Sequence, residues 1–119
     1  MSPYAPMDLP AAIAHFLSKP GAVETTPFGP DVLVYKVGGK MFALTQQDEF
    51  PASINLKCDP ERAIVLREEQ EAIIPGYHMN KRHWNTLTLD GSLPTKLVKE
   101  LIDHSYALVV ASLPKSQRP

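Results

Sequence analysis

Two β-rich runs joined by only two glycines constrain the fold of this chain more than any other feature. The runs cover residues 32–37 and 40–44, and Gly38-Gly39 lies between them. A two-residue Gly-Gly link accepts the positive φ values of a primed turn, which predicts an antiparallel hairpin. Counting outward from the turn gives the pairs Val37 with Lys40, Lys36 with Met41, and Tyr35 with Phe42.

This pairing divides the side chains of the hairpin between two faces of a sheet. Successive residues of a strand point to opposite faces, so each face collects every second residue. The more apolar set is expected to face the core: Leu33, Tyr35, Val37, Phe42 and Leu44. The opposite set holds Val32, Val34, Lys36, Met41 and Ala43, with the lysine near the turn.

Helical spacing of apolar residues predicts three helices around this hairpin. Each has a capping signal at its start, and the first and third also have a proline that breaks the helix at its end. The expected helices are residues 7–19 with Asp8 as cap, a second from Asp59-Pro60 to about Glu69, and a third from Ser92 or Leu93 to about Leu113.

Short strands are predicted at residues 53–57 and 84–89. In the second, Leu87 and Leu89 are expected to face the helices, which places Trp84 on the opposite face. Phe28, in the preceding turn region, is expected to anchor in the core. The order of elements predicts an α+β, two-layer sandwich, with a mainly antiparallel sheet and helices on one face. The 119 residues fit a single domain over residues 1–119.

Charge, cysteine content and apolar runs limit the environment. A formal net charge of −1 gives no whole-molecule attraction to nucleic acid or to a membrane, so such binding needs a local patch. The single Cys58 favours a reducing compartment. No signal-peptide pattern opens the sequence, and no apolar run approaches the roughly 20 residues that cross a bilayer. We therefore expect a soluble cytoplasmic protein with no membrane partner, as a monomer or weak dimer.

Five strings, taken in order, resemble the MmcQ/YjbR family of small bacterial proteins, and the likeness spans residues 7–115. They are residues 26–31 (TPFGPD), 38–43 (GGKMFA), 56–60 (LKCDP) and 75–84 (PGYHMNKRHW), with Ser105-Tyr106 in the last helix. The resemblance implies a frataxin-like (CyaY-like) fold with helices on one face of an antiparallel sheet. It also implies DNA binding through a double wing of β-hairpins.

The sequence favours neither a metal site nor catalysis. Frataxins carry clustered acids on the first helix, whereas this helix has only Asp8, so iron is not expected. His78 and His83 are five residues apart, a spacing that does not suit zinc chelation. Consecutive residues 103–105 (DHS) point about 100° apart on a helix and form no relay. We expect no cofactor, no metal and no enzyme activity.

The sharpest local feature is a separation of charge. Residues 59–71 hold five acids and two arginines, whereas residues 72–89 hold no acid. In the second stretch, two adjacent basic residues lie between histidine and aromatic residues, as contacts to phosphates and stacking on bases require. Lys81 and Arg82 are expected to contact phosphates, and Tyr77 and Trp84 to stack or wedge. With Lys36 and Lys40 on a wing, the candidate nucleic-acid site is Lys36, Lys40, Tyr77, Lys81, Arg82 and Trp84.

Two functional hypotheses remain open. The first is weak, salt-sensitive and non-enzymatic binding of double-stranded DNA through these six residues. The second is a protein-interaction or small-ligand module that uses the exposed face of the sheet. It predicts an apolar surface around Trp84, Met41 and Met79. Under either hypothesis Trp84 must lie on the surface, whereas a buried Trp84 would make residues 81–82 an ordinary solvated turn.

Overall fold

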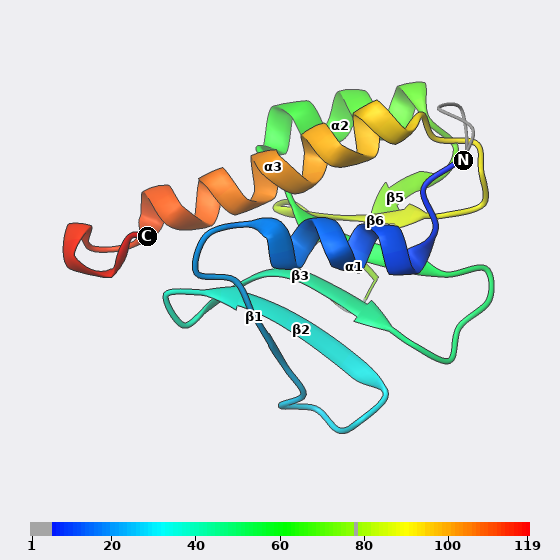
Figure 1. The fold of residues 1–119 in the computed structure, drawn as a ribbon. Coiled ribbons are helices and arrows are strands. Elements are labelled where there is room, and N and C mark those ends of the chain that lie inside the picture. The colour runs from blue at the N-terminus through cyan, green and yellow to red at the C-terminus, as the bar shows by residue number, and fades with distance from the viewer. Residues whose placement is uncertain (1–5, 78) are drawn as a thin grey trace.

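The computed structural model describes residues 6–77 and 79–119 as an α+β sandwich of two layers. One layer is a six-stranded sheet and the other consists of helices, which cover one face of that sheet (Figure 1). The fold class expected from the sequence is confirmed. The elements are α1 (Leu9–Ser18), β1 (Val23–Thr25), β2 (Val32–Val37), β3 (Lys40–Gln46), β4 (Ser53–Lys57), α2 (Pro60–Glu69), β5 (Ile73–Pro75), β6 (Trp84–Thr88), α3 (Thr95–Ser112) and a 3-10 turn, η1 (Lys115–Gln117).

The strands are arranged in the order β1-β2-β3-β4-β6-β5, and every neighbouring pair is antiparallel. The strand predicted at residues 53–57 is confirmed, and β6 ends one residue before the expected limit. The two edge strands, β1 and β5, were not expected. Each has three residues, which is too short for a period of two to be recognised, and Pro75 lies in one of them.

The predicted hairpin is confirmed, but its register shifts at Phe42. Val37 pairs with Lys40, and Lys36 with Met41, as expected. The predicted pair of Tyr35 with Phe42 is wrong, because a β-bulge inserts one residue and Tyr35 pairs with Ala43.

The bulge at Phe42 also reverses the sheet faces on which the next two residues, Ala43 and Leu44, lie. Phe42 and Ala43 both lie in the hydrophobic core, whereas Leu44 lies on the face without helices. Strict alternation had assigned Ala43 to the outer face and Leu44 to the core, so both assignments are wrong.

Ser105 of α3 fills the break that the bulge leaves between β3 and β4. Its hydroxyl donates to the carbonyl of Phe42 at 2.6 Å and accepts the backbone N–H of Lys57 at 2.9 Å. The side chain is fully buried. One helical serine therefore supplies both hydrogen bonds that the interrupted ladder lacks, and it fixes α3 to the middle of the sheet.

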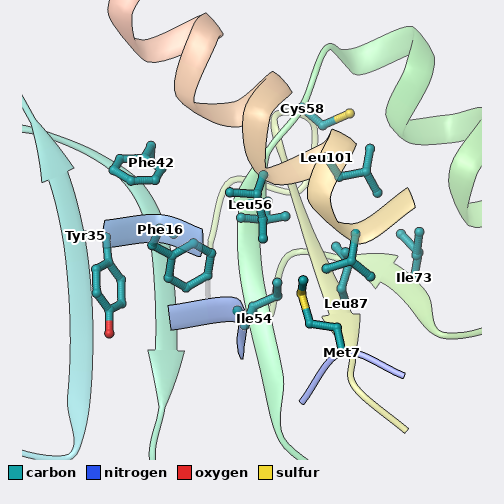
Figure 2. Packing of buried hydrophobic residues seen from close by; sticks show 14 of the residues in the cluster. Met7, Phe16, Tyr35, Phe42, Ile54, Leu56, Cys58, Ile73, Leu87 and Leu101 are labelled. Atoms are coloured by element: carbon teal, nitrogen blue, oxygen red, sulfur yellow. The ribbon is translucent and has the colours of Figure 1, made fainter. Parts of the chain in front are cut away.

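Aromatic rings from the helices and the hairpin meet between the layers (Figure 2). The ring centroid of Phe16 lies 4.7 Å from that of Tyr35 and 6.2 Å from that of Phe42. Phe42 also packs edge-on against Tyr106, at 5.4 Å. Phe28 is not part of this core, since its side chain is 69% exposed, so the predicted anchor is wrong. Its turn precedes β2 on the side of the sheet away from the helices.

Two of the three predicted helix caps are confirmed. Asp8 accepts the N–H of Ala11 at the start of α1, and Asp59 accepts the N–H of Arg62 at the start of α2. The predicted cap of α3 is wrong: the helix begins at Thr95 with Pro94 as N-cap, and the side chain of Ser92 bonds to Asp90 in the preceding turn. Of the helices described, none has the length and apolarity needed to span a bilayer.

Candidate ligand-binding groove

The face of the sheet without helices, the open face, is hollowed into a groove of about 670 Å³. The apolar part of its lining comes from strands and from two surrounding loops: Phe28, Val32, Met41, Leu44, Ile74, Tyr77 and Met79. The polar part lies mostly along the strands: Gln46, Ser53, Asn55, Thr86 and Thr88. A surface of this size and mixed character is typical of small-ligand sites.

Strand pairing builds the floor of the groove as a row of side chains across four strands. Leu44 pairs with Asn55, Asn55 with Thr86, and Thr86 with Ile74. The hydroxyl of Thr86 donates to Asn55 Oδ1 at 2.5 Å and accepts the N–H of Tyr77 at 3.0 Å. The floor is therefore polar at its centre and apolar on both sides.

The loop between β5 and β6, residues 76–83, forms one wall, and Arg67 of α2 holds it in place. Arg67 Nε donates to Asn85 Oδ1 at 2.7 Å, and its Nη2 donates to the carbonyls of Lys81 and Trp84. Within the loop, Asn80 Oδ1 accepts the N–H groups of residues 82 and 83. One cation on the helical side thus fixes the end of a loop from which Tyr77, Met79 and Asn80 line the groove.

Gly76 lets this loop pass close to β6. A Cβ atom on Gly76 would lie 2.8 Å from Cβ of Trp84 and 3.0 Å from its carbonyl oxygen. The N–H of Gly76 donates to that same carbonyl at 2.8 Å. A side chain at this position would push the wall away from the sheet.

The six residues of the predicted nucleic-acid site do not all lie together. Tyr77 lines the groove and is 62% exposed. Lys36 lies beside Met41 on the open face, and Trp84 lies there beside Lys57, half-buried. The alternation predicted for β6 is confirmed by this placement of Trp84.

The other three members of the set differ in position. Lys81 and Arg82 are exposed in the turn before β6. Lys40 reaches toward the helical layer, where its Nζ lies 3.4 Å from Ser112 Oγ at the end of α3. The antiparallel pairing places the hairpin turn, Lys57 and the 76–83 loop at one end of the sheet. Five of the six predicted nucleic-acid site residues, all except Lys40, therefore lie on the open face at this end or on its rim.

Charge differs between the two ends of the groove. Lys36 and Lys57 lie at the end just described, the basic end. Glu49 lines the opposite end, and Asp31 and Asp48 adjoin it in the same turns. The basic side chains were recognisable from the sequence pattern. Glu49, Asn55 and Phe28 were not recognisable as lining residues, because tertiary structure brings them together.

No group of three or more His, Cys, Asp or Glu side chains suited to a metal is found in the described part of the chain, and His78 lies outside it. Burial raises the pKa of the Cys58 thiol. His104 Nε2 accepts the N–H of Asp59, and the Ser105 hydroxyl bonds to backbone groups of the sheet. The two side chains therefore bond to separate backbone groups and form no proton relay.

Comparison with known proteins gives relatives over nearly the whole chain. The family model described as YjbR matches residues 17–108. The Escherichia coli K12 protein YjbR is 34% identical over 112 residues, which cover 94% of this chain and 95% of that protein. The protein YbdF of Escherichia coli O157:H7 is 40% identical over 89 residues, covering 75% of this chain and 73% of its own. Both relatives are named as uncharacterized proteins, so neither suggests a ligand.

Solved structures agree with the fold. The crystal structure of Deinococcus radiodurans protein DR2400 has a TM-score of 0.88 and 38% identity, and the match covers 98% of this chain and 87% of that one. A crystal structure of a Pseudomonas syringae protein has a TM-score of 0.76 and 31% identity, covering 87% of this chain and 99% of that one.

Proposed function

We propose a function for this chain, which belongs to the YjbR family: it is a non-catalytic protein that binds a small organic ligand in the groove of its open face. The observation that carries the proposal is the groove itself, about 670 Å³ in volume, with apolar walls around a polar centre. Ligand pockets commonly have about 300–1,000 Å³ and a few polar groups among apolar ones.

The way the walls are held supports this proposal. Arg67 and Asn80 fix the 76–83 loop through hydrogen bonds to its backbone. A wall that is already in place does not have to be ordered when a ligand binds, which lowers the entropic cost of binding. Met41 and Met79 in the lining add adaptable apolar surface.

The absence of catalysis is part of the proposal. The hydroxyl of Ser105 is bonded to two backbone groups, and burial raises the pKa of Cys58, which disfavours its thiolate. We place the binding in the cytoplasm, where a lone thiol remains reduced.

A neutral apolar fluorophore, phenylnaphthylamine, tests the groove directly. Its emission should rise saturably with protein concentration. Ile74→Arg places a charged side chain in the groove at an edge-strand position that is 45% exposed, and it should weaken binding at least tenfold. Ile64→Arg is the matched control, because Ile64 is 53% exposed on α2 and does not line the groove. No saturable rise with the wild type, or equal loss in both variants, would refute the proposal.

Double-stranded DNA is a second candidate, favoured by the basic residues at one end of the sheet. The β2–β3 turn and the 76–83 loop lie at the same end of the sheet and would act as two wings, with Lys36, Lys57, Lys81 and Arg82 contacting phosphates. Fluorescence anisotropy with a labelled random duplex at about 20 and about 200 mM salt tests this, because phosphate neutralisation predicts steep salt dependence. Wild-type affinity in a Lys81→Ala/Arg82→Ala variant would exclude it.

A further inference from the structure

We infer that the ligand of the groove is a small amphiphilic anion, with its single acidic group between Lys36 and Lys57 and its apolar body on Met41, Leu44 and Ile74. The inference rests on the proposed function and adds the chemical class and the orientation of the ligand. It follows from the position of two lysines, from the acids at the far end, and from the lining between them.

The two lysines lie beside the groove on its own face. Lys36 is the cross-strand partner of Met41, which lines the groove, and such partners have Cβ atoms about 5 Å apart. Lys57 follows Asn55 by two residues on β4, so both point to the same face about 7 Å apart. A lysine side chain is long enough to span either distance, so both ammonium groups can extend to the end of the groove, beside its lining residues.

Neither lysine has an acidic partner within the described residues, where the ion pairs are those of His15 and Lys19 with Asp103. Both lysines are half-buried as whole residues, and no opposite charge among the described residues compensates them. A carboxylate or sulfonate that entered the groove would supply this charge to both at once.

The far end of the groove repels a second anion. Glu49 lines it, and Asp31 and Asp48 lie in the adjoining turns. From Ser53 to Lys57 the strand β4 covers four residue steps, or about 13 Å. The groove therefore suits one anionic group followed by an apolar body of about this length, and it disfavours a ligand with an acid at each end.

The lining between the ends fits an apolar body of variable shape. Met41, Leu44 and Ile74 come from three strands, and Phe28 adds an aromatic ring from the turn that precedes β2. Flexible methionine side chains and an exposed aromatic ring adapt to different bodies, whereas the charge at the basic end stays fixed. Affinity is thus assigned to the apolar lining, and orientation to the lysines.

Two fluorophores with the same body separate this inference from the proposed function. Anilinonaphthalene sulfonate carries one anionic group, and phenylnaphthylamine carries none. We expect the wild type to bind the sulfonate about tenfold more tightly at low salt, since two half-exposed ion pairs contribute roughly this factor. The Lys36→Gln/Lys57→Gln variant should lose this preference and bind phenylnaphthylamine as the wild type does.

The matched control is Lys96→Gln/Lys99→Gln, which removes two exposed lysines of α3 and should leave both affinities unchanged. Near-ultraviolet circular dichroism confirms that each variant retains its packing before titration. Equal wild-type affinity for the two fluorophores, or an unchanged preference in the Lys36/Lys57 variant, would overturn the inference and leave the groove proposal standing. Binding of neither fluorophore would refute the groove proposal itself.

Discussion

Arg67 offers the sharpest test of how the fold positions the groove. Its guanidinium bonds to Asn85 Oδ1 and to the carbonyls of Lys81 and Trp84, so it joins α2 to the loop that forms one wall. Arg67→Ala removes these three contacts together. The loop should then lose its fixed position, and ligand affinity should fall although Arg67 does not line the groove.

The expected loss of stability can be worked from the same contacts. A hydrogen bond to a charged group contributes about 1.5–3 kcal/mol, and an unsatisfied buried polar group costs about 1–3 kcal/mol. The Lys81 carbonyl belongs to an exposed residue and regains water, whereas the bonds to Asn85 and Trp84 are partly buried. Asn85 is fully buried, and its Nδ2 has no hydrogen-bond partner among the described residues. We expect Arg67→Ala to lower the free energy of unfolding by about 2–4 kcal/mol.

A double-mutant cycle with Asn85→Leu isolates the decisive contact. In the wild type, Asn85→Leu should destabilise, because Arg67 Nε loses its acceptor while its Nη2 keeps two. In the Arg67→Ala background the same change should be neutral or stabilising, because it removes a buried amide without partners. Urea unfolding followed by Trp84 emission measures all four proteins, and phenylnaphthylamine titration measures the groove. A coupling energy below about 0.5 kcal/mol, or unchanged ligand affinity in Arg67→Ala, would refute the argument.

Three further predictions follow from single residues. Ser105→Ala leaves a buried carbonyl and a partly buried N–H unpaired, so urea unfolding should show a loss of about 2–4 kcal/mol, whereas Ser105→Thr should not restore it in so tight a site. Gly76→Ala should cost about 1–3 kcal/mol and weaken ligand binding, because its Cβ would meet Trp84 at 2.8 Å; an unchanged melting temperature would contradict this. Burial, and then the charge of Arg62, lower the pKa of His104, which accepts the N–H of Asp59. The contribution of neutral His104 to the free energy of unfolding should therefore be complete above about pH 6.5 and decrease as the pH drops below it, since the unfolded chain binds this proton more readily. His104→Gln should remove this part of the pH dependence.

The sequence predicted those parts of the fold that depend on neighbours along the chain. The Gly38-Gly39 turn, the caps at Asp8 and Asp59 and the strand at residues 53–57 need only local patterns, and all are confirmed. The face of Leu44 was wrong because a bulge depends on a partner, here Ser105, some sixty residues later in the chain. Alternation cannot detect such a contact.

The candidate site was predictable only in part, for the same reason. Alternation placed Lys36 and Trp84 on the open face, and pairing in the structure puts both there. The groove beside them depends on where Phe28 and the 76–83 loop come to rest, and Arg67 sets the loop from the other side of the sheet. The sequence therefore indicated the charges at one end of the site but not the groove that lies beside them.

The two candidate functions predict different dependences of affinity on salt concentration, because they use different numbers of charged contacts. Four cations, Lys36, Lys57, Lys81 and Arg82, gather at the basic end of a chain whose net charge is −1. Contact with four phosphates gives a slope of log affinity against log salt of about −3.6, so duplex affinity should fall by about 4,000-fold over a tenfold rise in salt. An amphiphilic ligand gains most of its affinity from apolar area, and only its contacts with Lys36 and Lys57 are screened. Binding that persists at high salt and depends on Ile74 thus belongs to the groove, whereas binding that vanishes with salt and depends on Lys81 and Arg82 belongs to the rim.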